Sequence, residues 1–84
     1  MIIKGRVVDK ATNIPIMFIA VKLDDLLTPQ KENIRDFTDT NGEFDFNVKN
    51  GPYQLEIRSP VHSPFTEQIN TDTNLLIKLA RITF

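Results

Sequence analysis

The stretch FTDTNGEFDFNVKNGPYQLEI, residues 37–57, decides the fold. Apolar residues alternate with polar residues twice in it, over 44–48 and again over 53–57. This period of two is typical of strands that bury one face. The dipeptide Asn50-Gly51 between the two segments is a strong hairpin signal, so the pattern predicts that the two strands pair with each other as a hairpin.

Five other segments have the composition of short strands, and each is bounded by turn-forming residues. We predict strands over 2–9, 17–23, 33–38, 65–69 and 75–82. The segment 24–32 is polar, is broken by a proline and has no sustained period, so it is expected to be the longest loop. Because no segment shows the period of an amphipathic helix, the chain is expected to be all-β. We predict a single domain over residues 1–84, folded as a small antiparallel Greek-key β-sandwich of about seven strands.

The composition narrows the class of protein. The chain has 84 residues, of which 40% are hydrophobic and 25% are charged, and this suits one soluble domain with a single modest core. It has no cysteine, so neither disulfides nor thiolate metal sites can supplement that core. The net charge of -1 lacks the basic excess that binds phosphate backbones, so nucleic acid is not an expected partner.

The first residues, MIIKGRVV, contain no long apolar segment and no small-residue cleavage site, so no signal peptide is expected. No stretch is long and apolar enough to cross a bilayer, so membrane insertion is not expected either. As written, the chain would be made in the cytoplasm, with a virion as one destination. It would be extracellular if it is a domain trimmed from a secreted protein.

Four blocks of residues, in order along the chain, carry a resemblance to a known family. They are Ile3-x-Gly5-x-Val7-x-Asp9-x-x-Thr12-x-x-Pro15-Ile16, Val21-x-Leu23, Thr38-Asp39-x-x-Gly42-x-Phe44 and Gly51-x-Tyr53-x-Leu55. With these blocks, residues 2–57 resemble the carboxypeptidase regulatory-like domain, a transthyretin-like sandwich. The same framework is similar to the N-terminal domain of prophage tail fibres. The chain departs from the family pattern at 60–65, where two prolines stand in place of the usual glycine and aromatic residue.

The resemblance implies a module without catalytic activity and without a cofactor. We expect a structural or docking part of a larger assembly that binds protein partners or associates with itself, with a phage or phage-like particle as the favoured setting. The alternative is a carbohydrate- or cell-surface-binding module of a bacterial envelope protein. A small hydrolase is not favoured, because the chain shows no convergent set of nucleophile, base and oxyanion donors.

Two polar features are candidate sites. Asp39, Asn41 and Glu43 offer oxygens that suit calcium, but they are too few for a calcium loop, and we favour the interpretation that Asp39 holds a turn. His62 is the one histidine, and without a second histidine or a cysteine it does not complete a zinc site. Because His62 lies in a segment with a proline on either side, we expect it to be exposed in a loop.

The aromatic residues have two interpretations. They could form a stacking platform for sugars or bases, or they could fill the core. Their alternation within the predicted strands favours the core for Phe44, Phe46, Tyr53 and Phe65.

Two regions carry the candidates for protein contacts. They are Leu26, Leu27, Pro29 and Gln30 in the long loop, and Leu76, Ile82 and Phe84 at the C-terminal end. The last predicted strand is apolar on both faces, which leaves two alternatives. Either one face packs on another subunit, or the strand is central and buries both faces.

A covalent crosslink is a further alternative. Some sandwich repeats of surface adhesins join a lysine to an asparagine beside a carboxylic acid. Lys4 or Lys22 with Asn74 and Glu56 would supply these groups, but the sequence alone gives no register that places them together.

Overall fold

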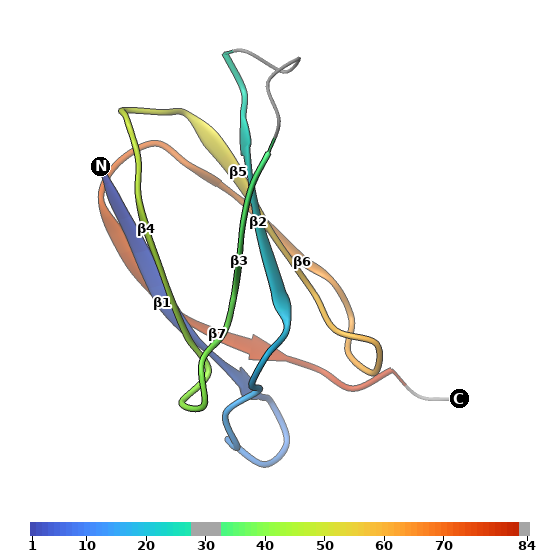
Figure 1. Ribbon diagram of the computed structural model, residues 1–84. Helices are drawn as coiled ribbons and strands as arrows, with labels where there is room; N and C mark the ends of the chain where they lie inside the picture. The colour runs from blue at the N-terminus through green and yellow to red at the C-terminus, as the bar shows by residue number, and fades with distance from the viewer. Residues whose placement is uncertain (28–32, 83–84) are drawn as a thin grey trace.

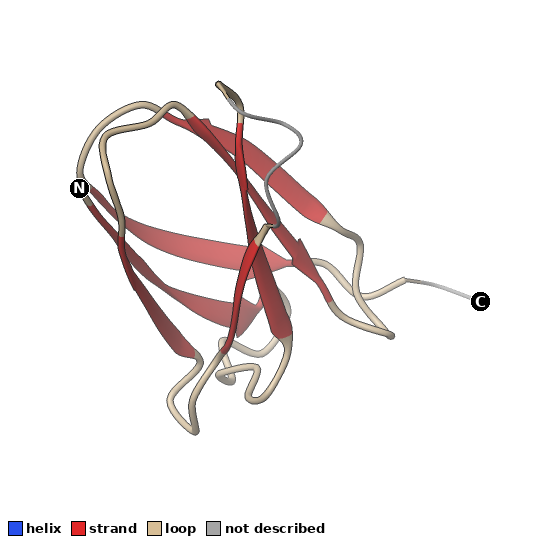
Figure 2. Ribbon diagram, turned by 45° about the horizontal axis from the view of Figure 1, so that its top comes forward, coloured by secondary structure: helices blue, strands red, loops and turns tan. Residues whose placement is uncertain are grey.

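The structure, a computed structural model, describes residues 1–27 and 33–82. These residues form seven strands and no helix, so the predicted all-β class is confirmed, and none of them belongs to a helix that could cross a membrane. The strands are β1 (Ile2–Asp9), β2 (Ala20–Asp25), β3 (Ile34–Phe37), β4 (Glu43–Asn47), β5 (Tyr53–Arg58), β6 (Phe65–Ile69) and β7 (Thr73–Leu79). They form two sheets that face each other as a sandwich (Figures 1 and 2).

The two sheets are antiparallel except for one pair of strands. One sheet has the order β4-β1-β7 and the other has the order β3-β2-β5-β6. The strand β1 pairs antiparallel with β4 and parallel with β7, so Lys4 lies between Asp45 on one side and Asn74 on the other. The parallel pair arises because β6 and β7, although consecutive in the chain, lie in different sheets. The chain therefore crosses the sandwich between them, and β7 runs in the same direction as β1 (Figure 1).

The predicted hairpin of β4 with β5 is wrong. The strand β4 pairs with β1, whereas β5 pairs with β2 and β6 in the opposite sheet. A two-residue turn at 50–51 would need an N–H from the next residue to close the pair, and that residue, Pro52, has none. The connection instead joins the sheets. Val48 donates its N–H to the carbonyl of Met1 at 2.9 Å, and the carbonyl of Pro52 accepts the N–H of Leu26 at 3.1 Å.

The core lies between the sheets and consists of the side chains that alternate inward. In β4 and β5 these are the predicted residues Phe44, Phe46, Tyr53, Leu55 and Ile57, all of them buried. Phe65 of β6 is half-buried and packs against them. The aromatic rings therefore fill the sandwich, as predicted, and burial of each large apolar side chain stabilises the fold by roughly 1.5–3 kcal/mol.

Gly5 in β1 makes room for the ring of Phe44, its partner in the β1–β4 register. A Cβ atom at position 5 would lie 2.8 Å from Cζ of Phe44 and 2.7 Å from the carbonyl oxygen of Leu75. Both distances are shorter than van der Waals contact. Any side chain at this position would therefore displace the ring or separate β1 from β7.

Two strands differ from the predicted bounds by more than one residue at each end. The second begins at Ala20 rather than at 17, because Phe18 has a left-handed backbone (φ 57) that a strand does not accommodate. The last begins at Thr73 and ends at Leu79, earlier than predicted at both ends. Because β7 is an edge strand and Leu76 on its outer face is 65% exposed, the alternative of a central strand with two buried faces is wrong.

Candidate interaction surface

The segment 10–19 joins β1 to β2, and its first half is ordered by Asp9. One oxygen of this carboxylate, Oδ1, accepts the N–H of Ala11 at 2.9 Å and the N–H of Thr12 at 3.1 Å. This arrangement is an Asx turn, which reverses the chain directly after β1. Asn13 follows with φ 60, a left-handed conformation that asparagine adopts more readily than most residues.

The second half of the segment is held by Thr38, which follows β3 and is 1% exposed. Its hydroxyl donates to the carbonyl of Ile16 at 2.8 Å and accepts the N–H of Ile19 at 3.1 Å. The main chain adds two more hydrogen bonds, from Phe18 N–H to the Thr38 carbonyl at 2.9 Å and from Thr38 N–H to the Ile19 carbonyl at 3.0 Å. We refer to these four bonds as the Thr38 clamp, and together they fix the backbone of residues 16–19.

The Thr38 clamp holds Phe18 in an unfavourable conformation. A bulky residue rarely adopts positive φ, and a strained residue of this kind persists only where its surroundings determine it. The side chain gains little in return, because it remains 63% exposed. Burial of the ring therefore does not offset the backbone strain at Phe18, and the ring stays exposed to water.

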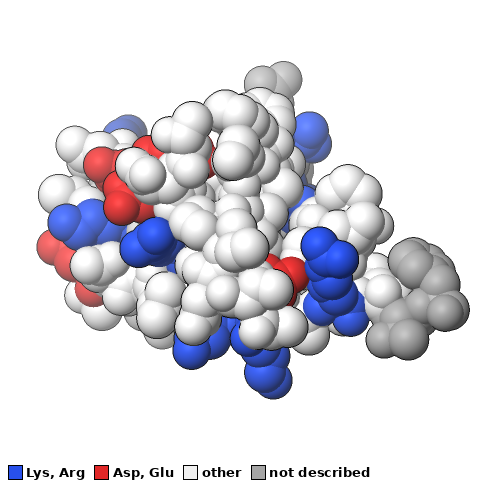
Figure 3. Space-filling model, turned by 90° about the horizontal axis from the view of Figure 1, so that it is seen from below, with Lys and Arg blue, Asp and Glu red and all other residues white. Residues whose placement is uncertain are grey.

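Phe18 is part of a group of exposed apolar side chains at one end of the sandwich, where β1, β3, β5 and β7 end. The group, which we call the apolar end, consists of Ile14, Met17, Phe18, Phe37, Val61 and Ile82. Figure 3 views the molecule from this end and shows a centre without charge, with acidic and basic side chains around the margin. Exposed apolar surface that is rimmed by polar groups often marks a contact site.

Of this group, only Ile82 is predicted from the sequence as a contact residue. Phe18 and Phe37 lie inside the predicted strands 17–23 and 33–38, where no contact role is expected of them. The available signal was the run 16–19, in which four apolar residues in succession break the alternation of a half-buried strand.

His62 is buried, so the prediction of an exposed loop residue is wrong. Its Nε2 lies 2.9 Å from Oδ2 of Asp9, and its Nδ1 lies 2.7 Å from the hydroxyl of Ser59. Arg81 approaches the same Asp9 oxygen at 3.3 Å. The hydrogen bond from His62, opposed by burial and aided by two backbone amides and Arg81, lowers the pKa of Asp9 to about 2. The hydrogen bonds of this cluster join the β5–β6 loop and Arg81 to the end of β1.

Hydrogen bonds link Ser59 to His62 and His62 to Asp9, as the serine, histidine and aspartate of a hydrolytic triad are linked. The surroundings, however, do not suit such a triad. Such a site needs free N–H groups to stabilise an oxyanion beside the nucleophile. The neighbouring amides are already used: Val61 N–H points to the Ser59 hydroxyl, His62 N–H to the Ser59 carbonyl and Ser63 N–H to the carbonyl of Ala80. The geometry therefore favours a structural role for the cluster.

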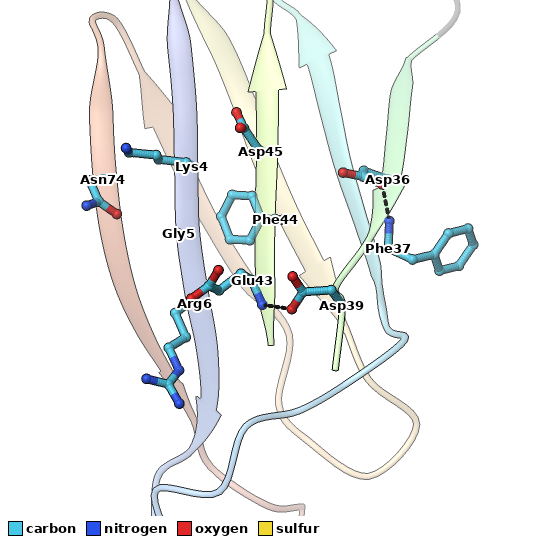
Figure 4. A pocket seen from close by; sticks show the side chains of 10 residues that line it. All are labelled: Lys4, Gly5, Arg6, Asp36, Phe37, Asp39, Glu43, Phe44, Asp45 and Asn74. Carbon is cyan, nitrogen blue, oxygen red and sulfur yellow. Dashed lines mark hydrogen bonds between the residues drawn. The ribbon is translucent and has the colours of Figure 1, made fainter. Parts of the chain in front are cut away.

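The outer face of the β4-β1-β7 sheet carries an acidic hollow of about 570 Å³. Its charged lining comprises two cations, Lys4 and Arg6, and four carboxylates, Asp36, Asp39, Glu43 and Asp45. Figure 4 shows Asp36 turned toward this hollow from β3, and Phe37, the next residue, also belongs to the lining. Phe37 also lies opposite Ala20 in the β2–β3 register.

The outer face of the other sheet carries a basic hollow of about 360 Å³, lined by Ala20, Lys22, Arg35, Glu56 and Arg58. The single carboxylate lies 3.4 Å from Lys22 Nζ and 3.1 Å from Arg58 Nε. Burial raises the pKa of Glu56, but Lys22 and then Arg58 outweigh this effect, so the pKa lies below its usual range. Glu56 therefore stays ionised and leaves an excess of positive charge around it.

The predicted calcium candidates form a turn. Oδ1 of Asp39 accepts the N–H of Asn41 at 2.8 Å and the N–H of Glu43 at 2.9 Å. The carbonyl of Asn41 accepts a hydrogen bond from Arg6 Nε at 3.1 Å, so a cation already lies beside this turn. Among residues 1–27 and 33–82, no three or more acidic, histidine or cysteine side chains gather as a metal site would require.

The predicted contact residues lie in three places. Leu26 (40% exposed) and Leu27 (69%) follow β2 at the end of the sandwich opposite the apolar end, Leu76 lies on the outer face of β7, and Ile82 belongs to the apolar end. The structure does not bring these residues together as one surface. Pro29, Gln30 and Phe84 lie outside the described residues.

The fold is shared with solved structures of several kinds. The major pilin subunit of Bacillus cereus matches with a TM-score of 0.73 and 17% identity, over 96% of this chain and 30% of the pilin. The 5-hydroxyisourate hydrolase of Klebsiella pneumoniae matches with a TM-score of 0.75 and 16% identity, over 99% of this chain and 93% of the hydrolase. A proposed carbohydrate binding protein from Bacteroides uniformis has a TM-score of 0.67 and 18% identity, over 93% of this chain and 40% of that protein.

At these identities the similarity shows the fold alone, which is transthyretin-like, and the chain spans less than half of the pilin and of the Bacteroides protein. No curated protein matches the chain in sequence. The family model described as the carboxypeptidase regulatory-like domain matches residues 2–80, which extends the predicted resemblance across β6 and β7. The chain therefore belongs to the carboxypeptidase regulatory-like domain family.

Proposed function

We propose that residues 1–84 act as one non-catalytic docking domain of a larger assembly and that a protein partner binds at the apolar end. The observation that carries this proposal is Phe18, which the buried Thr38 holds in a left-handed conformation with its ring 63% exposed. Because the backbone at Phe18 is fixed before binding, less conformational entropy is lost on contact, and aromatic residues are enriched in interfaces. Phe37, at 61% exposure, adds a second ring at the same end.

A fibre or particle outside the cytoplasm is the setting that we favour. The similarity of the sequence to the N-terminal domain of prophage tail fibres supports a phage or phage-like particle. The fold shared with a pilin subunit supports a cell-surface fibre equally well. Antibodies against the chain would decide between the two, since they would label either purified phage-like particles or the surface of intact cells.

The docking proposal is tested with the immobilised chain and quantitative mass spectrometry of the proteins that it retains. The double substitution Phe18→Ser and Phe37→Ser should reduce capture of a true partner at least about tenfold, because loss of two anchors removes most of the binding energy. Leu76→Ser is the matched control, since Leu76 is as exposed (65%) but lies on the outer face of β7. Equal capture by the wild type and the double variant would refute the proposal.

A carbohydrate-binding module is the second candidate, because exposed aromatic rings also stack on sugars. Among the described residues, Phe18 and Phe37 are the rings that are exposed. A glycan array should be probed with and without calcium, using the wild type and the Phe18→Ser, Phe37→Ser variant. A sugar that binds only the wild type would favour this candidate, and an array without any such sugar would remove it.

A further inference from the structure

The two hollows on the outer faces of the sandwich carry opposite charge. The acidic hollow has four carboxylates against two cations. The basic hollow has three cations against one carboxylate. Counting each ionised side chain as one unit, the acidic hollow has a net charge of -2 and the basic hollow has a net charge of +2. Patches of equal and opposite charge are complementary as docking surfaces.

The hollows face in opposite directions. In β1, Ile3 and Val7 are buried in the core, so the alternating Lys4 and Arg6 point outward from the β4-β1-β7 sheet. In β2, Val21 is likewise buried, so Lys22 points outward from the other sheet. The two hollows therefore cannot meet within one molecule, although the acidic hollow of one molecule can meet the basic hollow of another.

Several of the charges are available for such a contact. Glu43 and Asp45 are exposed, and neither lies within ion-pair distance of a cation among the described residues. On the basic side Arg58 is 72% exposed, and Glu56 is the one carboxylate in the hollow. Arg35 makes its hydrogen bond to the side-chain oxygen of Asn33, which is uncharged. Arg35 on one face and Glu43 and Asp45 on the other are therefore in no ion pair among the described residues, whereas Arg58 shares the Glu56 carboxylate with Lys22.

We propose that copies of this chain associate head to tail, with Arg35 and Arg58 of one copy against Glu43 and Asp45 of the next. The inference rests on the proposed docking function and adds a partner, a second copy, which binds through the outer faces of the two sheets. Such a contact is heterologous, because it uses two different patches, and a row of copies keeps one free patch of each sign at its two ends. Heterologous contacts that do not close into a ring extend into an open row.

Light scattering after size-exclusion chromatography tests the proposal. The wild type should grow in mass with concentration at about 50 mM NaCl, and its association constant should fall about tenfold at about 500 mM, where salt screens surface charge. The variant Arg35→Glu, Arg58→Glu and the variant Glu43→Lys, Asp45→Lys should each remain monomeric. The wild type offers both patches and associates with itself. Each reversed variant is therefore mixed with a variant that offers one patch only.

The decisive experiment therefore mixes two variants, and each of them keeps only one of the two native hollows. The variant reversed at Arg35 and Arg58 keeps its acidic hollow, and the variant reversed at Glu43 and Asp45 keeps its basic hollow. Their mixture should associate through the two native patches and also through the two reversed patches, which are complementary as well, so it should grow beyond a one-to-one dimer. Neutral versions, Arg35→Gln with Arg58→Gln and Glu43→Gln with Asp45→Asn, remove this second contact and should stop at the dimer.

The control for net charge is Lys10→Glu with Lys49→Glu, which changes the charge by the same amount as reversal of the two arginines but outside both hollows. It should associate as the wild type does. A wild type that stays monomeric at low salt, or a neutral pair that does not dimerise on mixing although circular dichroism shows both folded, would overturn the inference. Phe18→Ser, which changes the apolar end outside both hollows, should still self-associate, so failure of the apolar end and failure of the charged contact are told apart.

Discussion

The hydroxyl of Thr38 donates a hydrogen bond of 2.8 Å to the carbonyl of Ile16, across 22 residues of sequence. The same oxygen accepts the N–H of Ile19, so one buried side chain satisfies two backbone groups of a segment that lies outside the seven strands. Backbone polar groups that are shielded from water need such partners. The conformation of Phe18, which lies between those two residues, follows from this single threonine.

Thr38→Val removes the hydroxyl and keeps the shape of the side chain. It leaves the Ile16 carbonyl and the Ile19 N–H without their partner, so we expect the free energy of unfolding to fall by roughly 1–3 kcal/mol. Urea denaturation measures this change, and hydrogen exchange at the Phe18 amide should accelerate by more than the global destabilisation explains. Thr40→Val in the exposed turn is the control, with an expected change within about 0.5 kcal/mol. Equal effects of the two substitutions would contradict the role of the clamp.

Gly5→Ala should destabilise the sandwich by roughly 1–3 kcal/mol, because its Cβ would overlap the ring of Phe44 and the carbonyl of Leu75. Phe44→Leu creates space beside position 5 and should reduce the effect of the alanine. A double-mutant cycle by urea denaturation should therefore give a favourable coupling of at least about 0.5 kcal/mol. Lys4→Ala, which changes the exposed face of the same strand, is the control. Strictly additive effects would show that the ring does not set the requirement for glycine.

The sequence predicted the strands well because alternation reports which face of a strand is buried. Phe44, Phe46 and Leu55 all point inward, as their spacing implied. Alternation does not report which strand is the neighbour. Two inward-facing strands joined by a short turn look the same whether they pair as a hairpin or face each other across a sandwich. Only Pro52, which cannot close a two-residue hairpin, distinguished these cases here.

The site was harder to predict, because its contacts join residues far apart in the chain. The burial of His62 depends on Asp9, 53 residues away, and no local pattern encodes that distance. The exposure of Phe18 depends on Thr38 in the same way. The turn at Asp39 was predicted correctly because an Asx turn is local, and its hydrogen bonds reach only to Asn41 and Glu43.

The position of Lys4 beside Asn74 permits a test of the crosslink considered from the sequence. The two residues are partners in the parallel β1–β7 register, but both are exposed on the outer face, where water hydrates the lysine ammonium and opposes its attack on an amide. We therefore expect no crosslink, and the intact mass of the purified chain should equal that of the sequence. A mass lower by one ammonia that is restored in Asn74→Ala would contradict this expectation.

The pKa of Asp9, lowered from 3.8 to about 2 in the folded chain, predicts how stability changes in acid. A group whose pKa is lower in the folded state stabilises the fold fully above its ordinary pKa, and this contribution is lost as the pH falls through the folded value. For Asp9 the loss should occur between about pH 4 and pH 2, where protonation weakens the hydrogen bonds from His62 and Arg81. Urea midpoints measured across this range should decline for the wild type, and the decline should be smaller for Asp9→Asn, which has no proton to gain. Asp45→Asn, on the exposed face, should retain the slope of the wild type. If Asp9→Asn and the wild type lose stability in parallel, other carboxylates are responsible, and the cluster of Asp9, His62 and Ser59 does not hold this end of the fold.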